Sequence, residues 1–334
     1  MNDKKKMFLG SLLVASVLAS PVMAAVSSSE AARLGQGLTP FGSEKAGNEA
    51  GTIPPWTGGL TPDDAPPGYE GTGQHHIDPF PDDQVLFTIT ASNADQYKEH
   101  LTDGQLALLE TYPTSFRIPV YRSRRTHAVP DWVAENIKEN AVSAEIVGKG
   151  AGLDGAFGGY PFPILHGNNE QKGWQVIWNH LTRWRGISLS RRSSEVAVQT
   201  NGDYTLVTSQ QEAFLNFYNP EGGEEDLDNV IFYYLSFTQS PPRLAGGALL
   251  VHETLNQIIN PRNGWGYNAG QRRVRRAPNL GYDSPIAAAD NLRTADDTDI
   301  FNGALDRYNW EYEGMREIYV PYNNYMLGEE GVPY

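Results

Sequence analysis

The sequence predicts a strand-rich α+β protein built around an antiparallel sheet. Beyond Gly186 the chain consists of short runs rich in β-branched and aromatic residues, separated by turn-forming residues. These runs follow one another without helices between them, so neighbouring strands are expected to pair antiparallel rather than as βαβ units. Helical patterns lie before Gly186, which indicates an α+β rather than an all-β protein.

Residues 25–82 predict an irregular N-terminal arm in front of a β domain at residues 83–334. The arm has few periodic apolar residues and many Pro and Gly punctuators, as in Ile53-Pro-Pro-Trp-Thr-Gly-Gly59. We expect Trp56 to anchor this arm to the domain surface. The alternative is a linker without a fixed position, and composition alone does not separate the two.

The first half of the β domain mixes short strands with three helices. Pro119 has no N–H to donate, so its strand is expected at a sheet edge or a bulge. Gly186 is a natural residue to follow the end of the third helix. The predicted elements are a strand at 85–90, a helix at 93–110, a strand at 115–121, a helix starting near Asp131 and a helix at about 170–185.

The second half is predicted to form the main sheet. Asn268-Ala-Gly270 is typical of a hairpin turn between two strands. The predicted strands are 187–193, 194–198, 204–209, 230–237, 248–252, the two arms of a hairpin at 264–276, 308–312 and 317–322.

Residues 1–24 have the pattern of an export signal. Lys4, Lys5 and Lys6 precede an apolar run, and Val22 and Ala24 are small residues at the −3 and −1 positions of a cleavage site. The run is shorter than the roughly 20 apolar residues of a membrane-spanning helix. We therefore expect a periplasmic protein that does not span the membrane.

Composition excludes several functional classes. The chain has no cysteine, which rules out disulfides, thiolate metal sites, thiol nucleophiles and an acylated N-terminal cysteine. Its formal net charge of −14 opposes binding to nucleic acid, whose phosphates would be repelled.

No motif indicates an enzyme, a cofactor or a metal site. The chain has no G-x-S-x-G elbow, no H-E-x-x-H and no phosphate-binding loop. His75-His76 with Asp78 lacks a second ligand pair at suitable spacing. Asp296, Asp297 and Asp299 lack the Gly and Glu of an EF-hand, so we expect a solvated turn there.

Four arginines in the predicted hairpin are a candidate docking surface. Arg272, Arg273, Arg275 and Arg276 lie in a stretch, Thr254 to Tyr282, that has no acidic residue. A guanidinium presents a planar fork that matches carboxylate or phosphate, which suits an acidic partner or headgroup. The alternative is internal ion pairing with the carboxylates of the chain itself, which would contribute little stability if exposed.

The third helix carries a candidate wall of a ligand cavity. Its apolar residues repeat at i, i+3, i+4 and i+7 and define one face. Two aromatic residues in the preceding loop are candidates for a lid. Ordinary core packing is the alternative for both groups, which comprise Trp174, Ile177, Trp178 and Leu181 on the helix and Tyr160 and Phe162 in the loop.

An ordered set of sequence blocks resembles the exported bacterial family called domain of unknown function 1329. The blocks are Leu38–Gly59, Ala91–Tyr97, Gly158–Ile164, Ile177–His180, Tyr267–Pro278, Leu292–Asp297 and Phe301–Gly303.

The resemblance implies a fold similar to the LolA/LolB lipoprotein carriers. That fold is a half-barrel, a strongly curved antiparallel sheet with helices on its concave side. Members of the family are associated with transporters of the RND superfamily, and no catalytic residues carry over. Since family members continue into further strands, the β domain is expected to be incomplete at its C-terminal end.

Together these observations predict a non-enzymatic periplasmic carrier or accessory protein for a lipid or other lipophilic molecule, working with an RND-type transporter. One alternative is a structural or docking module of an envelope complex that has no ligand. Another is a carbohydrate-binding exported protein, suggested by Trp56, Trp265, Trp310 and 17 tyrosines.

Overall fold

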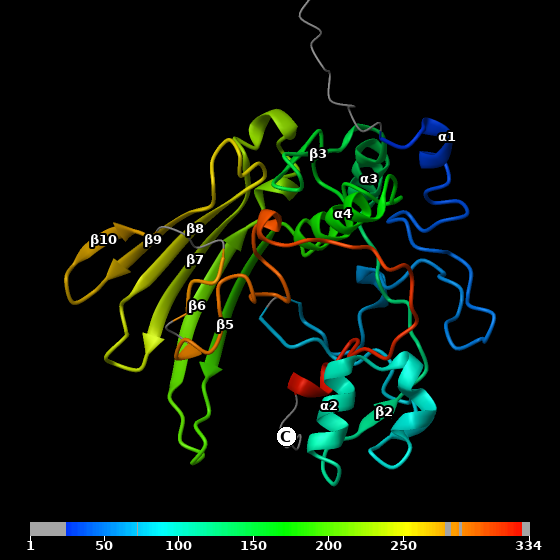
Figure 1. Cartoon of the computed structure of the whole chain (residues 1–334), viewed down its shortest axis with the longest axis horizontal. Helices are drawn as coiled ribbons and strands as arrows, with labels where there is room; N and C mark the ends of the chain where they lie inside the picture. Colours follow the sequence, from blue (N-terminus) through cyan, green and yellow to red (C-terminus); the bar gives the residue numbers. More distant parts are fainter. Residues whose placement is uncertain (1–24, 72, 278–281, 287–288, 329–334) are drawn as a thin grey trace, which may run out of the picture.

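The main body of the protein is a six-stranded antiparallel sheet, seen in a computed structural model (Figure 1). The structure describes residues 25–71, 73–277, 282–286 and 289–328, so the predicted signal peptide at 1–24 lies outside the described residues. The strand order is β10-β9-β8-β7-β6-β5. The strands are β5 Ser188–Val196, β6 Leu206–Phe214, β7 Val230–Ser240, β8 Ala248–Thr254, β9 Asn263–Asn268 and β10 Arg273–Arg276.

The strand-rich α+β class and the antiparallel sheet are confirmed, as is the hairpin of β9 and β10. The prediction of two strands at 187–193 and 194–198 was wrong, because β5 is continuous across them. Ser193 and Ser194 do not turn the chain: they pair with Ser209 and Thr208 of β6. The Ser194 and Thr208 hydroxyls also lie 2.9 Å apart across the two strands. The strong curvature of a half-barrel, with helices on its concave side, stays a prediction.

Helices pack at one end of this sheet, where β6 ends and β7 begins (Figure 1). They are the short α1 Ser28–Ala31, α3 Asp131–Ser143 and α4 Asn169–Leu181, and the two-stranded hairpin of β3 Glu145–Val147 and β4 Gly152–Asp154 lies beside them. The apolar core formed here includes Ile137 of α3, Trp178 of α4 and Ile231 of β7.

Helix α4 ends earlier than predicted. The Asn168 side chain caps its start by accepting from Gln171 N. At its end, the Tyr218 hydroxyl donates to the Thr182 carbonyl oxygen (2.5 Å), which a longer helix would use for its own ladder. The Thr182 hydroxyl in turn donates to the Trp178 carbonyl (2.7 Å), so the last turn is closed by side chains.

A smaller module lies apart from the sheet and has its own apolar core (Figure 1). It contains the two-stranded sheet of β1 Phe87–Ile89 and β2 Ile118–Val120, the 3₁₀-helix η2 Ala94–His100 and the helix α2 Asp103–Thr111. Since this sheet has two strands within the described part of the chain, Pro119 sits in an edge strand, as its missing N–H predicted.

The single helix predicted at 93–110 is in fact two. Leu101 is extended and buried in the core of the small module, which breaks the helical path. The Thr102 side chain then accepts from Gln105 N and starts α2 with a capping box. Burial of one leucine and a local cap therefore outweigh the helical periodicity of the whole stretch.

The strands predicted at 308–312 and 317–322 are absent, since this segment is an extended strap without a ladder partner. Its backbone bonds are isolated: Tyr312 N donates to Asn169 O (3.2 Å) and Tyr319 N donates to His100 O (2.9 Å). The Tyr319 ring packs in the core of the small module, whereas Trp310 packs on the main core. The strap therefore connects the two cores.

The N-terminal arm makes specific contacts with residues 125–127. Trp56 Nε1 donates to the His127 carbonyl oxygen (2.9 Å), and the Phe41 ring packs edge-on against both Trp56 and His127. Arg125 donates to the Glu44 carbonyl oxygen (2.5 Å) and to neighbouring acceptors of the arm. Trp56 thus makes the contact expected of an anchor, while the division into an arm at 25–82 and a domain at 83–334 remains a proposal.

Acidification is expected to destabilise this anchor through His127. Burial lowers the pKa of His127 below its usual value near 6.5. Below that value the unfolded chain takes up a proton that the folded state resists, so the free energy of unfolding falls as the pH drops. At pH values well above 6.5 His127 is neutral in both the folded and the unfolded chain, so it does not lower the free energy of unfolding there. Urea unfolding at pH 7.5 and 5.5 should show a smaller pH effect in His127→Gln than in the wild type. An equal effect in both would contradict this, and exposed His75→Gln is the control.

Among the described residues no helix combines the length and apolar character needed to cross a membrane.

Candidate functional site

One face of the six-stranded sheet is partly covered by the segment that follows β10. Arg293 of this segment forms an ion pair with Glu195 of β5 (2.8 Å), and the segment runs beside β5 and β6 in Figure 1. On the same face Gln211 is buried and accepts from Arg191 Nε (2.6 Å). This covered face therefore carries hydrogen-bonded and ion-paired side chains at β5 and β6, and it also includes apolar residues such as the buried Val207 and, further along the sheet, Leu249.

The opposite face carries an exposed apolar row. Residues directly opposite each other in antiparallel strands share a face. Phe237 of β7 is paired with Ala248 of β8, and Ala248 with Tyr267 of β9. Tyr267 is in turn paired with Val274 of β10. Phe237 is 44%, Tyr267 38% and Val274 62% exposed, so apolar surface crosses four strands in solvent.

Two further rows extend this surface along the strands. Leu235, Leu250 and Trp265 form one row. In the other, the His252 ring lies 4.8 Å from the Tyr233 ring, and it is also 4.8 Å from the Trp265 ring of the row above. We call these side chains the open face, and none of its larger members belongs to either apolar core of the described residues. It comprises Phe214, Tyr233, Leu235, Phe237, Ala248, Leu250, His252, Trp265, Tyr267 and Val274.

The apolar residues predicted as a cavity wall come together, but inside the main core. Trp178 is 1% exposed, and its Nε1 donates to the Gly150 carbonyl oxygen (3.1 Å). Phe162 is also buried. Half-buried residues pack around them: Trp174, Ile177, Leu181 and Tyr160. Burial raises the pKa of Tyr160.

The space beside this group is small. A cavity of about 30 Å³ touches Phe162 and Trp174. That volume suits a water molecule or two, not an acyl chain. The role of this group as a ligand wall stays a prediction, and the open face is the larger apolar surface.

The four arginines of the hairpin are all exposed, and the side chains of three have no ion pair or hydrogen bond with the described residues. Arg276 donates to the Asn263 side chain. Arg272, Arg273 and Arg275 remain without such a partner in the part of the chain that the structure describes. Internal ion pairs instead involve Arg124, Arg183, Arg185, Arg262, Arg293 and Arg307. The hairpin arginines are thus available to a partner, and docking itself stays a prediction.

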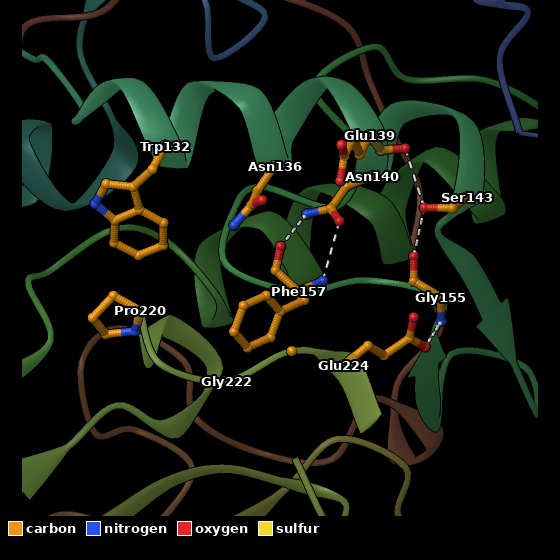
Figure 2. Close-up of a pocket in the computed structure, with 11 residues that line it drawn as sticks. Trp132, Asn136, Glu139, Asn140, Ser143, Gly155, Phe157, Pro220, Gly222 and Glu224 are labelled. Carbon is orange, nitrogen blue, oxygen red and sulfur yellow. Dashed lines mark hydrogen bonds between the residues drawn. The ribbon is translucent and has the colours of Figure 1, made fainter. Parts of the chain in front are cut away.

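A cleft of about 540 Å³ lies between α3 and the loop after β6 (Figure 2). Its walls are mixed: the rings of Trp132 and Phe157 face the amide of Asn136 and the carboxylates of Glu139 and Glu224. Glu224 accepts from Gly155 N (2.9 Å), which ties the loop to the helical end of the sheet. The lining therefore combines aromatic, amide and acidic groups.

The sequence predicted no metal site, and two residues of the groups considered there make other contacts. No group of three or more His, Asp or Glu side chains among the described residues is arranged to hold a metal ion. The His76 ring stacks on Tyr69, and Asp299 binds Arg183 and Arg185.

Fold and surfaces together define a class: a strand-rich α+β protein whose open antiparallel sheet has one accessible apolar face. The chain belongs to the family described as protein of unknown function (DUF1329), whose family model matches residues 88–334. The resemblance of the sequence blocks to this family is thereby confirmed.

An uncharacterized protein of Pseudomonas aeruginosa is 48% identical over 339 residues, an alignment that covers 100% of this chain and 72% of the relative. A DUF1329 family protein from Desulfovibrio piger has 16% identity and a TM-score of 0.33, over 44% of this chain and 56% of that one. A domain provisionally described as an outer membrane lipoprotein-sorting protein, from Vibrio parahaemolyticus, has 15% identity and a TM-score of 0.28, over 38% of this chain and 51% of that one. This chain therefore spans little more than half of each solved structure.

The open face was not predicted from the sequence, although the residues of β7 contain a pattern that is consistent with it. Tyr233, Leu235 and Phe237 alternate along β7, but Phe232 and Tyr234 between them are also aromatic. Such a run indicates a strand that is apolar on both faces, without showing which face is left open.

Proposed function

We propose that the protein is a non-enzymatic carrier or accessory protein of the periplasm. It holds a lipid or another lipophilic molecule on the open face and works with a transporter of the RND superfamily. The observation that carries this proposal is the exposed apolar surface across β7, β8, β9 and β10. The carrier role implied by the family resemblance agrees with it.

The physical basis is the cost of leaving apolar surface in water. Burial of apolar area stabilises a complex by about 25 cal/mol per Å², so a surface of this kind favours an apolar ligand over solvent. Each CH₂ of an acyl chain gains about 0.8 kcal/mol on burial, so such a chain needs a cover when it crosses an aqueous compartment. Binding and release then require no covalent step.

The alternative of carbohydrate binding has less support. Trp56 Nε1 donates to the His127 carbonyl, and Trp310 Nε1 donates to the Leu305 carbonyl (3.0 Å). Both rings also pack against other aromatic rings. Of the three tryptophans, only Trp265 lies on an accessible sheet face, beside apolar neighbours.

Charges on the open face are expected to abolish lipid retention. In Phe237→Glu/Tyr267→Glu, two carboxylates would stand in the exposed apolar row, and bound lipid should fall at least about tenfold, since an ion is costly to desolvate. Protein purified from the periplasm would be extracted and the extract read by mass spectrometry. Exposed Val176→Glu on α4 is the matched control, because it adds a charge outside the open face. Equal lipid in all three proteins, or no lipid in the wild type, would contradict the proposal.

A further inference from the structure

We propose that β10 is a docking edge that takes up an extended, acidic segment of another protein as an additional strand of the sheet. This inference does not require a lipid on the open face. It stands on three observations: the position of β10 in the sheet, the direction of its free backbone groups and the uncompensated charge of its side chains.

β10 is a terminal strand of the main sheet. Within the described residues it pairs only with β9, and all four of its residues are exposed. β5 forms the other edge, and two of its side chains are already bonded on one face of the sheet: Arg191 to Gln211 and Glu195 to Arg293 of the covering segment. An exposed edge offers a row of N–H and C=O groups to another strand.

The hydrogen-bond pattern shows which groups of β10 point outward. Ala277 N donates to Gly264 O (2.8 Å), which marks that pair as hydrogen-bonded. Hydrogen-bonded and non-hydrogen-bonded pairs alternate in an antiparallel ladder. Arg273 and Arg275 therefore bond β9, whereas the N–H and C=O of Val274 and Arg276 face the free edge. These two residues are the ones that an added strand would bond.

The side chains define what the added strand must carry. Arg273 and Arg275 project from the face shared with Gly266, whereas Val274 projects from the open face beside Tyr267. A strand that pairs with β10 thus meets two guanidinium groups on one face. On the other face it meets Val274 and Arg276, whose guanidinium donates to the Asn263 side chain. Acidic residues two positions apart, with an apolar residue between them, match this pattern through charge-assisted hydrogen bonds and cross-strand packing.

The same charges exclude a second copy of β10 as the occupant. Two β10 edges placed side by side would bring arginines opposite arginines, which is destabilising. Short, charged edge strands are a common protection against self-association. In this chain the same arginines that repel a second copy of β10 favour the binding of an acidic strand.

The test uses synthetic peptides and the intact protein. The probe is an eight-residue peptide of alternating Glu and Val, with an alternating Lys and Val peptide for charge and an N-methylated Glu/Val peptide that lacks strand-pairing N–H groups. Fluorescence anisotropy at low salt should detect only the unmethylated acidic peptide. Anionic phospholipid vesicles are tested in parallel.

Two variants separate the backbone from the charge. Val274→Pro removes one outward N–H and leaves the ladder with β9 intact, so binding should weaken about tenfold relative to Val274→Ala. Arg273→Glu/Arg275→Glu should lose the acidic peptide by about 100-fold and bind the Lys/Val peptide instead. Exposed Arg243→Glu, in the turn after β7, is the charge control and should bind like the wild type.

Three results would overturn the proposal. The first is equal binding of the acidic peptide to Val274→Pro and Val274→Ala. The second is equal binding of the N-methylated and unmethylated peptides to the wild type, which decides the case even if Val274→Pro fails to fold. The third is binding of anionic vesicles, but not of the acidic peptide, with the same dependence on Arg273 and Arg275.

Discussion

Replacement of Trp178 by alanine is expected to lower the free energy of unfolding by about 3–5 kcal/mol. Trp178 is 1% exposed and lies at the centre of the core that joins α3, α4 and the ends of β6 and β7. Its removal would leave a cavity, because close-packed neighbours relax only in part. It would also take a donor from the Gly150 carbonyl oxygen, which accepts from Trp178 Nε1 at 3.1 Å. Urea unfolding followed by circular dichroism measures the loss.

Two variants test that reason for the loss. Val176→Ala lies two residues away on the same helix but is exposed, so it should change stability by less than about 1 kcal/mol. Trp178→Phe keeps most of the apolar volume and should fall between Val176→Ala and Trp178→Ala. If Trp178→Ala were as mild as Val176→Ala, this residue would not be the centre of the core.

The second large effect is expected at the buried ion pair of Arg262 and Glu253. Arg262 Nη2 lies 2.5 Å from Glu253 Oε2, and each side chain is 6% exposed. Arg262 also donates to the Asn302 carbonyl oxygen (2.6 Å), so it links β8 to the segment after β10. Arg262→Met would leave the Glu253 carboxylate buried without its cation and should cost about 3–5 kcal/mol.

A matched exposed pair separates burial from charge. Arg307 lies 3.0 Å from Asp283 at the surface, where water screens the pair, so Arg307→Met should leave the free energy of unfolding nearly unchanged. The double variant Glu253→Leu/Arg262→Met should recover most of the loss, because apolar side chains of similar size replace a buried pair at little cost. A double variant as unstable as Arg262→Met alone would show that the cost is packing rather than an unpaired charge.

Local patterns predicted most of the secondary structure for a clear reason. The strands after Gly186 and the starts of α3 and α4 depend on periodicity, turns and caps that act within a few residues. The errors lie where distant residues intervene. The helix predicted at 93–110 breaks because Leu101 enters the core of the small module. The predicted strand at 317–322 is a strap because its backbone bonds a residue of η2, His100, instead of another strand.

The candidate sites show the same difference between what local sequence predicts and what distant residues decide. The exposed, charged hairpin of Arg272 to Arg276 was visible in the sequence, since four basic residues within five positions and no nearby acid have few internal partners. The stripe on α4 was equally visible, but periodicity shows only that a helix face is apolar. What covers that face depends on residues far away in the chain, such as Phe41 and Phe301, which pack against the same core.

The sequence by itself determined the α+β class, the antiparallel order, the hairpin of β9 and β10 and the family. Only the tertiary structure decided which apolar surfaces are filled and which are open. Trp178 is buried in the main core, whereas the row of side chains across the sheet that includes Phe237 and Val274 is exposed to solvent. The physical reason is that strand and helix periods are local, whereas the cover of a face comes from another part of the chain. Here the segment after β10 lies on one side of the sheet, and the opposite face is left open.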